Sequence, residues 1–165
     1  MKDTISISRI EQLHPDIRED MTNFINDVEA GEDIILRIVQ GLRTFEAQND
    51  IYQQGRTKPG AIVTNAKAGS SYHNYGLAID VVQMKDGKPN WNYNYKKLRP
   101  YYKKYGLTWG ADWDGDGKTK DEGDKDEHLV DMPHYEKTFG YNWRQLLEKY
   151  NKKDFIPGTS YVKLK

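Results

Sequence analysis

The stretch SYHNYGLAID, residues 71–80, combines the end of a polar loop with the start of an apolar strand. His73 lies at the end of the loop, and Asp80 lies inside an apolar run, residues 77–82. A carboxylate in such a run is costly unless it is paired or bound to a metal. Gly76 is small enough to permit close backbone approach. The stretch therefore presents an imidazole and a buried carboxylate, which are two candidate metal ligands but not yet a site.

A second stretch, DMPHYE, residues 131–136, again places a histidine and carboxylates in an apolar setting. Asp131 precedes His134 by three residues and is the candidate general base that moves the proton of an attacking water. Glu136 shares a strand face with His134 and is a candidate partner that orients this ligand. Catalytic zinc takes three protein ligands and keeps one position open. The sequence therefore predicts zinc ligands at His73, Asp80 and His134.

The composition of the chain limits which partners and metal ligands we expect. The chain of 165 residues fits one domain, with 25 Lys and Arg against 25 Asp and Glu, so nothing indicates nucleic acid or an anionic membrane as partner. Cysteine is absent, which leaves histidine and carboxylate as the strong metal ligands. No apolar run approaches the roughly 20 residues that span a bilayer. The first residues lack the apolar core of a signal peptide, so we expect synthesis in the cytoplasm.

Apolar periodicity predicts an α+β fold in which helices flank a small, mostly antiparallel sheet. Pro100 is expected to kink or split one of the helices. We expect a catalytic domain over residues 1–150 and a C-terminal extension over 151–165. The predicted helices cover residues 15–30, 44–54, 95–105 and 141–150, and the predicted strands cover 34–39, 77–82, 107–111 and 128–136.

The two stretches resemble the signature of the LAS-type, VanY-like zinc peptidases, SxHxxGxAxD followed by carboxylate-x-x-His. The resemblance extends to QGLRT at residues 40–44, to Gln48 and to YQQGRT at residues 52–57. The stretch 41–80 looks most like the branch of phage endolysins that are L-alanyl-D-glutamate peptidases. The resemblance implies the LAS-type peptidase fold, zinc as cofactor and a peptidoglycan stem peptide as substrate.

The resemblance also implies roles for single residues. Asp131 would be the base, and Arg43 would polarise the scissile carbonyl. Gln48 and Ser71 would contact the substrate, while Arg56 is open between a substrate contact and a structural role. The implied protein is a monomeric endolysin that reaches the wall after release. The alternatives are a D-Ala-D-Ala carboxypeptidase or dipeptidase of the same family and a non-catalytic, zinc- or calcium-dependent wall-binding module.

The stretch DWDGDGK, residues 112–118, has acids at alternate positions and a glycine at the sixth, like the first half of a calcium loop. Position twelve is Gly123 instead of the usual Glu. A solvated acidic turn is the alternative. We hypothesise that calcium orders this loop and thereby positions the Asp131–His134 segment. The expected calcium ligands are Asp112, Asp114, Asp116, the Lys118 carbonyl, and Asp121 or Glu122.

Overall fold

The computed structural model describes residues 1–125 and 129–165. His128, the first residue of the predicted strand 128–136, lies outside the described residues. In the described part of the chain, no helix has both the length and the apolar character needed to cross a membrane.

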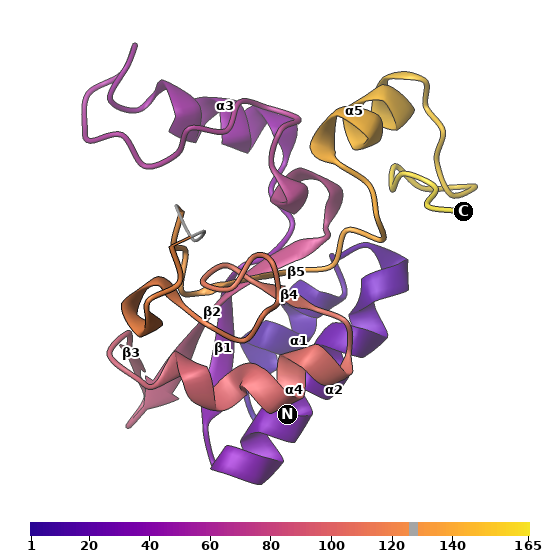
Figure 1. Cartoon of the computed structure of the whole chain (residues 1–165). Coiled ribbons are helices and arrows are strands. Elements are labelled where there is room, and N and C mark those ends of the chain that lie inside the picture. The colour runs from indigo at the N-terminus through magenta and orange to yellow at the C-terminus, as the bar shows by residue number, and fades with distance from the viewer. Residues whose placement is uncertain (126–128) are drawn as a thin grey trace.

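A five-stranded sheet runs through the centre of the molecule (Figure 1). Its order is β1-β2-β5-β4, with β3 paired to β2, and every pairing is antiparallel. This confirms the predicted α+β class with an antiparallel sheet. The strands are β1 (Ile35–Gln40), β2 (Ala78–Lys85), β3 (Lys88–Asn90), β4 (Thr108–Trp109) and β5 (His134–Glu136).

The helices lie in two groups (Figure 1). In the view shown, α1, α2 and α4 lie around the lower half of the sheet, and α3 and α5 lie above it. Pro100 falls in the first turn of α4 and a 3₁₀ turn precedes it, so the predicted helix is split as expected. The α-helices are α1 (Thr4–Ile10), α2 (Arg18–Glu32), α3 (Phe45–Gln53), α4 (Arg99–Lys104) and α5 (Trp143–Asn151), and the 3₁₀ helices are Pro15–Ile17, Tyr72–Tyr75, Tyr95–Leu98 and Lys120–Glu122.

Two apolar cores hold these layers together. The larger core joins α1, α2 and α4 to the sheet, and the smaller one lies under α5. The C-terminal residues Val162 and Leu164 are buried in the smaller core. The His14 ring accepts the Asp16 N–H at Nδ1, so its Nε2–H donates to the Val162 carbonyl at 2.7 Å. Residues 151–165 are therefore packed onto the domain and do not hang free of it.

Two elements were not expected from the sequence, and two strands are shorter than predicted. In α1, Ile5 and Ile7 are exposed while Ser6 is buried, so the helix shows no apolar stripe. The edge strand β3 contains a proline, which an edge tolerates because one face of its backbone needs no partner. The predicted strands 107–111 and 128–136 shrink to β4 and β5, of two and three residues.

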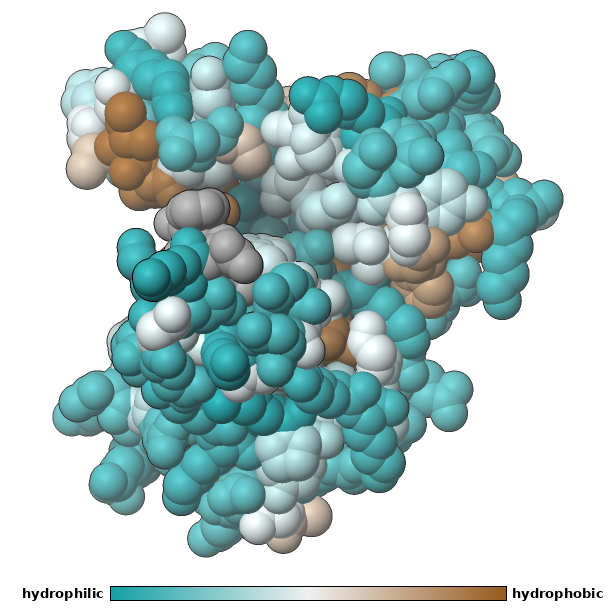
Figure 2. Space-filling model, in the orientation of Figure 1, coloured by the Kyte–Doolittle hydropathy of each residue, from teal (hydrophilic) through white to brown (hydrophobic). Residues whose placement is uncertain are grey.

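The surface is hollowed between the lobe that carries α3 and the body of the molecule below it (Figure 2). An apolar patch lies on that lobe in the same view. The loop after α3 contributes two strongly exposed apolar side chains, Ile62 and Val63. Leu129 and Val130 directly precede the Asp131–His134 segment in sequence and are also exposed apolar residues.

Candidate metal centre and active site

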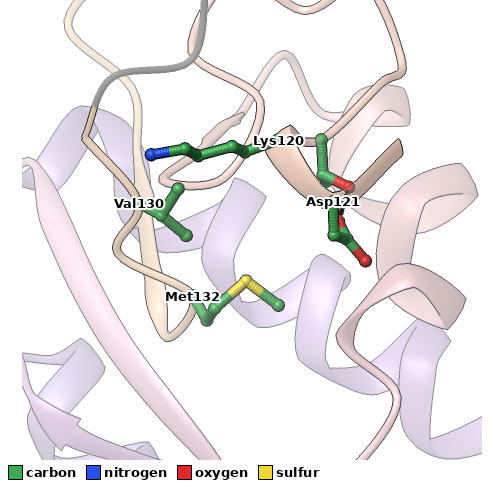
Figure 3. A pocket seen from close by; sticks show the side chains of 5 residues that line it. Lys120, Asp121, Val130 and Met132 are labelled. Carbon is green, nitrogen blue, oxygen red and sulfur yellow. Dashed lines mark hydrogen bonds between the residues drawn. The ribbon is translucent and has the colours of Figure 1, made fainter. Parts of the chain in front are cut away.

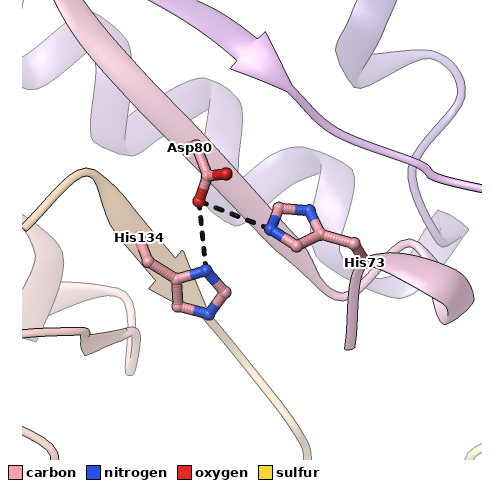
Figure 4. A group of neighbouring side chains, drawn as sticks. All are labelled: His73, Asp80 and His134. Carbon is pink, nitrogen blue, oxygen red and sulfur yellow. Dashed lines mark hydrogen bonds and ion pairs between the residues drawn. The ribbon is translucent and has the colours of Figure 1, made fainter. Parts of the chain in front are cut away.

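His73, Asp80 and His134 converge on one point (Figure 4). His73 Nε2 lies 3.3 Å and His134 Nδ1 lies 3.1 Å from Asp80 Oδ1. One nitrogen or oxygen from each residue lies within 4.8 Å of the others, which is the spacing of a shared metal ion. The structure therefore brings together the three residues that the sequence predicts as zinc ligands.

Local backbone geometry delivers these side chains. The antiparallel pairing of β2 with β5 sets Asp80 opposite His134. His73 lies in the 3₁₀ helix Tyr72–Tyr75, which ends at Gly76 with φ of 69°. A Cβ at Gly76 would lie 2.5 Å from the His14 nitrogen, so both the backbone angle and the space require glycine.

Each histidine is held by one ring nitrogen and offers the other to the centre. His73 Nδ1 donates to the Gly41 carbonyl at 2.9 Å, which leaves Nε2 facing Asp80. His134 Nε2 donates to Glu136 Oε1 at 2.7 Å, which leaves Nδ1 facing Asp80. Outer partners of this kind fix the orientation of metal-binding imidazoles. The donor set of two nitrogens and one carboxylate oxygen fits zinc with an open coordination position.

The centre is electrostatically polarised. Burial works to raise the pKa of Asp80, but the two histidines hold it well below the ordinary value, so the carboxylate stays ionised. Burial also works to lower the pKa of His134, but the bonds to Asp80 and Glu136 raise it to about 9. Asp80 therefore offers an ionised carboxylate to a divalent cation.

Asp131 lies beside the centre with Oδ2 4.0 Å from His134 Nδ1, and its side chain is half-exposed. Burial and then the charge of Asp80 raise the pKa of Asp131. A raised pKa makes a carboxylate a better proton acceptor. The backbone of Gly110 fixes this segment, because it accepts from Asp131 N at 2.7 Å and donates to the His134 carbonyl at 2.8 Å. A Cβ at Gly110 would overlap the Asp131 carbonyl oxygen, a constraint that the sequence did not reveal.

Arg43 faces the same centre from the connection between β1 and α3. Burial lowers its pKa, and the charges of Asp80 and Asp131 oppose that effect. One guanidinium nitrogen donates to Gln48 Oε1 at 2.9 Å. The guanidinium is thus fixed near the two carboxylates that the proposed chemistry would use.

The three predicted substrate contacts are engaged within the protein. Gln48 is fully buried and donates to the Ala66 carbonyl at 2.7 Å, so its side chain supports the neighbouring loop and Arg43. Ser71 caps the 3₁₀ helix by accepting the His73 N–H. Arg56 lies over the Tyr52 ring, and its guanidinium donates to three oxygens of its own lobe, on Tyr52, Thr64 and Asn65. These contacts hold Arg56 within its lobe, and its role in substrate binding stays a prediction.

The acidic loop gathers some of its predicted ligands. Carboxylate oxygens of Asp112, Asp114 and Asp116 lie within 4.8 Å of one another. Asp112 is 1% exposed, and its Oδ1 is buried without a hydrogen-bond partner. Among the described residues, Asp121 and Glu122, one of which was expected to complete this group, do not join it. Lys96 pairs with both of these acids, at 2.7 and 2.8 Å. The Lys118 N–H donates to Asp116 Oδ1.

Trp113 connects the acidic loop to the metal centre. Its ring centroid lies 5.6 Å from that of His134. Its indole N–H donates to the Leu129 carbonyl at 2.8 Å, which joins the two ends of the loop. One side chain of the acidic loop therefore lies against the candidate ligand His134.

A cavity of about 320 Å³ lies next to the segment that carries Asp131 (Figure 3). Val130 and Met132, the two neighbours of Asp131 in sequence, line one side of it, and Lys120 and Asp121 line another. The lining is mostly apolar and includes two charged residues, as in many ligand pockets.

Comparison with known proteins identifies the family. A family model described as VanY, D-alanyl-D-alanine carboxypeptidase, matches residues 10–129, well over half of the chain. The chain belongs to the VanY family. The matched part of this VanY-family chain contains His73 and Asp80 and ends before Asp131 and His134.

Several relatives resemble this VanY-family chain. The peptidoglycan L-alanyl-D-glutamate endopeptidase CwlK of Bacillus subtilis (strain 168) is 39% identical over 112 residues, which are 61% of this chain and 66% of the relative, just under two thirds of its length. The crystal structure of the Serratia marcescens L-Ala D-Glu endopeptidase ChiX has a TM-score of 0.54 at 22% identity and covers 82% of this chain and 88% of its own.

A mutant of the vancomycin-resistance D,D-pentapeptidase VanY, from a VanB-type cassette and in complex with Zn(II), has a TM-score of 0.53 at 20% identity. The match covers 75% of this chain and 71% of that chain. At such identities these two structures show the shared fold, which agrees with the predicted LAS-type architecture.

Proposed function

We propose that this protein is a zinc peptidase that hydrolyses the L-alanyl-D-glutamate bond of the peptidoglycan stem peptide. The observation that carries the proposal is the convergence of His73, Asp80 and His134, with Asp131 beside them, in a chain of the VanY family. The choice of bond is supported by the likeness to a relative described as an L-alanyl-D-glutamate endopeptidase.

In this proposal His73, Asp80 and His134 hold the zinc ion, which when bound supplies a Lewis acid that activates water and polarises a carbonyl. Asp131 accepts the proton of the attacking water and passes it to the leaving amine. Its raised pKa and half-exposed position suit that role. Arg43 holds the oxygen of the scissile carbonyl, where charge develops during attack.

The role of Asp131 is tested by replacing it with Ala. Asp131→Ala should lower the hydrolysis of purified wall peptides by a factor of about 10² to 10⁴, as expected for loss of a general base. Zinc content should stay at the wild-type level, because Asp131 is not a ligand. The matched control is Asp50→Ala, since Asp50 is an exposed acid that pairs with Lys58 on the surface. Undiminished hydrolysis by Asp131→Ala would refute the mechanism.

Two other functions are alternatives to this proposal. A D-Ala-D-Ala carboxypeptidase or dipeptidase agrees with the family description, and mass spectrometry of the products separates it: new N-terminal D-Glu supports the endopeptidase, and released D-Ala supports the carboxypeptidase. A non-catalytic wall-binding module would bind peptidoglycan without releasing any product. The position of Asp131 beside the metal centre favours an enzyme over such a module.

The biological setting is part of the proposal. We infer an endolysin-type role in which the protein, acting as a monomer, is made in the cytoplasm and meets the wall after release. Expression from within a bacterial host should cause lysis only once the inner membrane is permeabilised. Lysis without permeabilisation, or a protein recovered from the wall of intact cells, would contradict this setting.

We further propose that the acidic loop binds calcium. The supporting observation is the unpaired, buried Asp112 Oδ1 within the group formed with Asp114 and Asp116. With one oxygen from each of these three residues, three or more further oxygens must come from the backbone, water or a rearranged loop, because calcium takes six to eight ligands. Since Trp113 lies in this loop and against His134, calcium should also affect the zinc centre.

Calcium binding is measured by titrating the protein with calcium chloride and following tryptophan fluorescence and the melting temperature. Both should change in the wild type and not in Asp112→Asn. The control is Asp86→Asn, in an exposed turn on the β2–β3 hairpin, which should respond as the wild type does. A wild type whose fluorescence, melting temperature and hydrolysis are all unaffected by calcium would exclude the site.

A further inference from the structure

Asn74 is a buried amide that takes no part in the proposed chemistry but connects the parts that do. It follows His73 in the 3₁₀ helix Tyr72–Tyr75 and is 6% exposed. Its carboxamide forms hydrogen bonds to the backbone of the loop before His73 and to the backbone of Arg43. The identity of this side chain is left open by the SxHxxGxAxD pattern, in which it occupies an x position.

The acceptor side of Asn74 fixes the loop before the histidine. Asn74 Oδ1 accepts from the N–H of Gly69 at 3.0 Å and from that of Ser71 at 3.3 Å. Two backbone donors at one oxygen define which end of the amide points toward this loop. The loop is also held at Gly69 by the Tyr75 hydroxyl, which donates to its carbonyl at 2.6 Å.

The donor side of Asn74 holds Arg43. Asn74 Nδ2 donates to the Arg43 carbonyl at 3.0 Å and lies 3.5 Å from Gln48 Oε1. The same Gln48 oxygen accepts from the Arg43 guanidinium at 2.9 Å. The Arg43 N–H in turn donates to the His73 carbonyl at 3.0 Å. Asn74 therefore touches both the backbone of Arg43 and the acceptor that fixes its guanidinium.

We propose that Asn74 is a positioning residue that sets the Arg43 guanidinium in register with the metal centre, directly through the Arg43 carbonyl and indirectly through Gln48. The inference rests on the proposed peptidase function, because it assigns Arg43 to the scissile carbonyl. A guanidinium displaced by about 1 Å from the developing oxyanion can lower the rate about 100-fold.

The test uses Asn74→Asp, which keeps both bonds from Gly69 and Ser71 and places a carboxylate oxygen where the donor was. That oxygen repels the Arg43 carbonyl and Gln48 Oε1, so the guanidinium should move. We expect kcat to fall between about 10-fold and 100-fold with KM changed by less than about threefold. Zinc stoichiometry should equal that of the wild type, because no metal ligand is altered.

A double-mutant cycle separates positioning from a general loss of structure. In an Arg43→Ala background, Asn74→Asp should change kcat by less than about threefold, because the group that it positions is gone. The ¹H–¹⁵N signal of the Arg43 Nε–H should shift in Asn74→Asp. It should stay in place in Asn142→Asp, which makes the same chemical change in the exposed capping box of α5.

Three results would contradict the positioning role of Asn74. An unchanged kcat in Asn74→Asp, an equal loss in the Arg43→Ala background, or a loss of zinc would overturn the inference. If Asn74→Asp does not fold, Asn74→Ala, which buries no charge, is measured in the same cycle. If the wild type itself hydrolyses no wall peptide, the proposed function fails, while the Arg43 signal still reports whether Asn74 sets the guanidinium.

Discussion

Replacing Glu136 by Gln should weaken zinc binding without removing a ligand. Glu136 Oε1 accepts from His134 Nε2 at 2.7 Å, and both side chains are buried. A hydrogen bond to a charged group contributes about 1.5–3 kcal/mol, and a neutral one about 0.5–1.5 kcal/mol. Glutamine can still accept this bond but carries no charge, so the loss should be about 1–1.5 kcal/mol. That loss corresponds to a zinc Kd raised roughly 10-fold.

The assay for Glu136→Gln is a competition titration of zinc against a chromogenic chelator. All variants are measured at one fixed pH, because protons compete with the metal for His134. The matched control is Glu148→Gln on α5, where Glu148 forms an exposed pair with Lys152 at 2.6 Å. Its zinc Kd should equal that of the wild type. The reasoning fails if Glu136→Gln binds zinc as tightly as the wild type, or if Glu148→Gln weakens binding equally.

Two further predictions concern the backbone around the site and the C-terminal residues. Gly110→Ala should lower stability by about 1–3 kcal/mol and hydrolysis by about 100-fold, since its methyl group overlaps the Asp131 carbonyl; an unchanged urea midpoint with full activity would contradict this. Burial lowers the pKa of His14 below its ordinary value of 6.5. Above pH 6.5 the imidazole is therefore mostly neutral in both the folded and the unfolded state. As the pH falls below 6.5, the unfolded state binds the proton first, which lowers the free energy of unfolding. Urea titrations between pH 7 and 5 should therefore show a steeper loss of stability in the wild type than in His14→Asn, and equal slopes would refute this.

The parts of the site that lie close together in the sequence could be predicted from it. His73 and Asp80 belong to one turn-and-strand unit, so their approach depends on local backbone geometry that residue types such as Gly76 already indicate. His134 required the pairing of β2 with β5, which comes from a distant segment. Its place in the ligand set rested on its apolar setting and on a matching signature.

What the sequence could not supply is the direction in which long polar side chains turn. Gln48 and Arg56 carry donors that suit a substrate, but the folding of residues 60–66 back over α3 gives those donors backbone acceptors first. The short helix α1 was missed for a related reason. It is stabilised by the Asp3 cap and by the Ile38 N–H that donates to Ser6 Oγ, not by an apolar stripe.

The most direct test of the metal centre is a crystal structure of the zinc-loaded protein with diffraction data collected on both sides of the zinc absorption edge. One anomalous peak should lie among His73 Nε2, Asp80 and His134 Nδ1, with His134 Nε2 still hydrogen-bonded to Glu136. A peak at another position, or a zinc ion bound through His134 Nε2, would contradict the account of how this chain holds its metal.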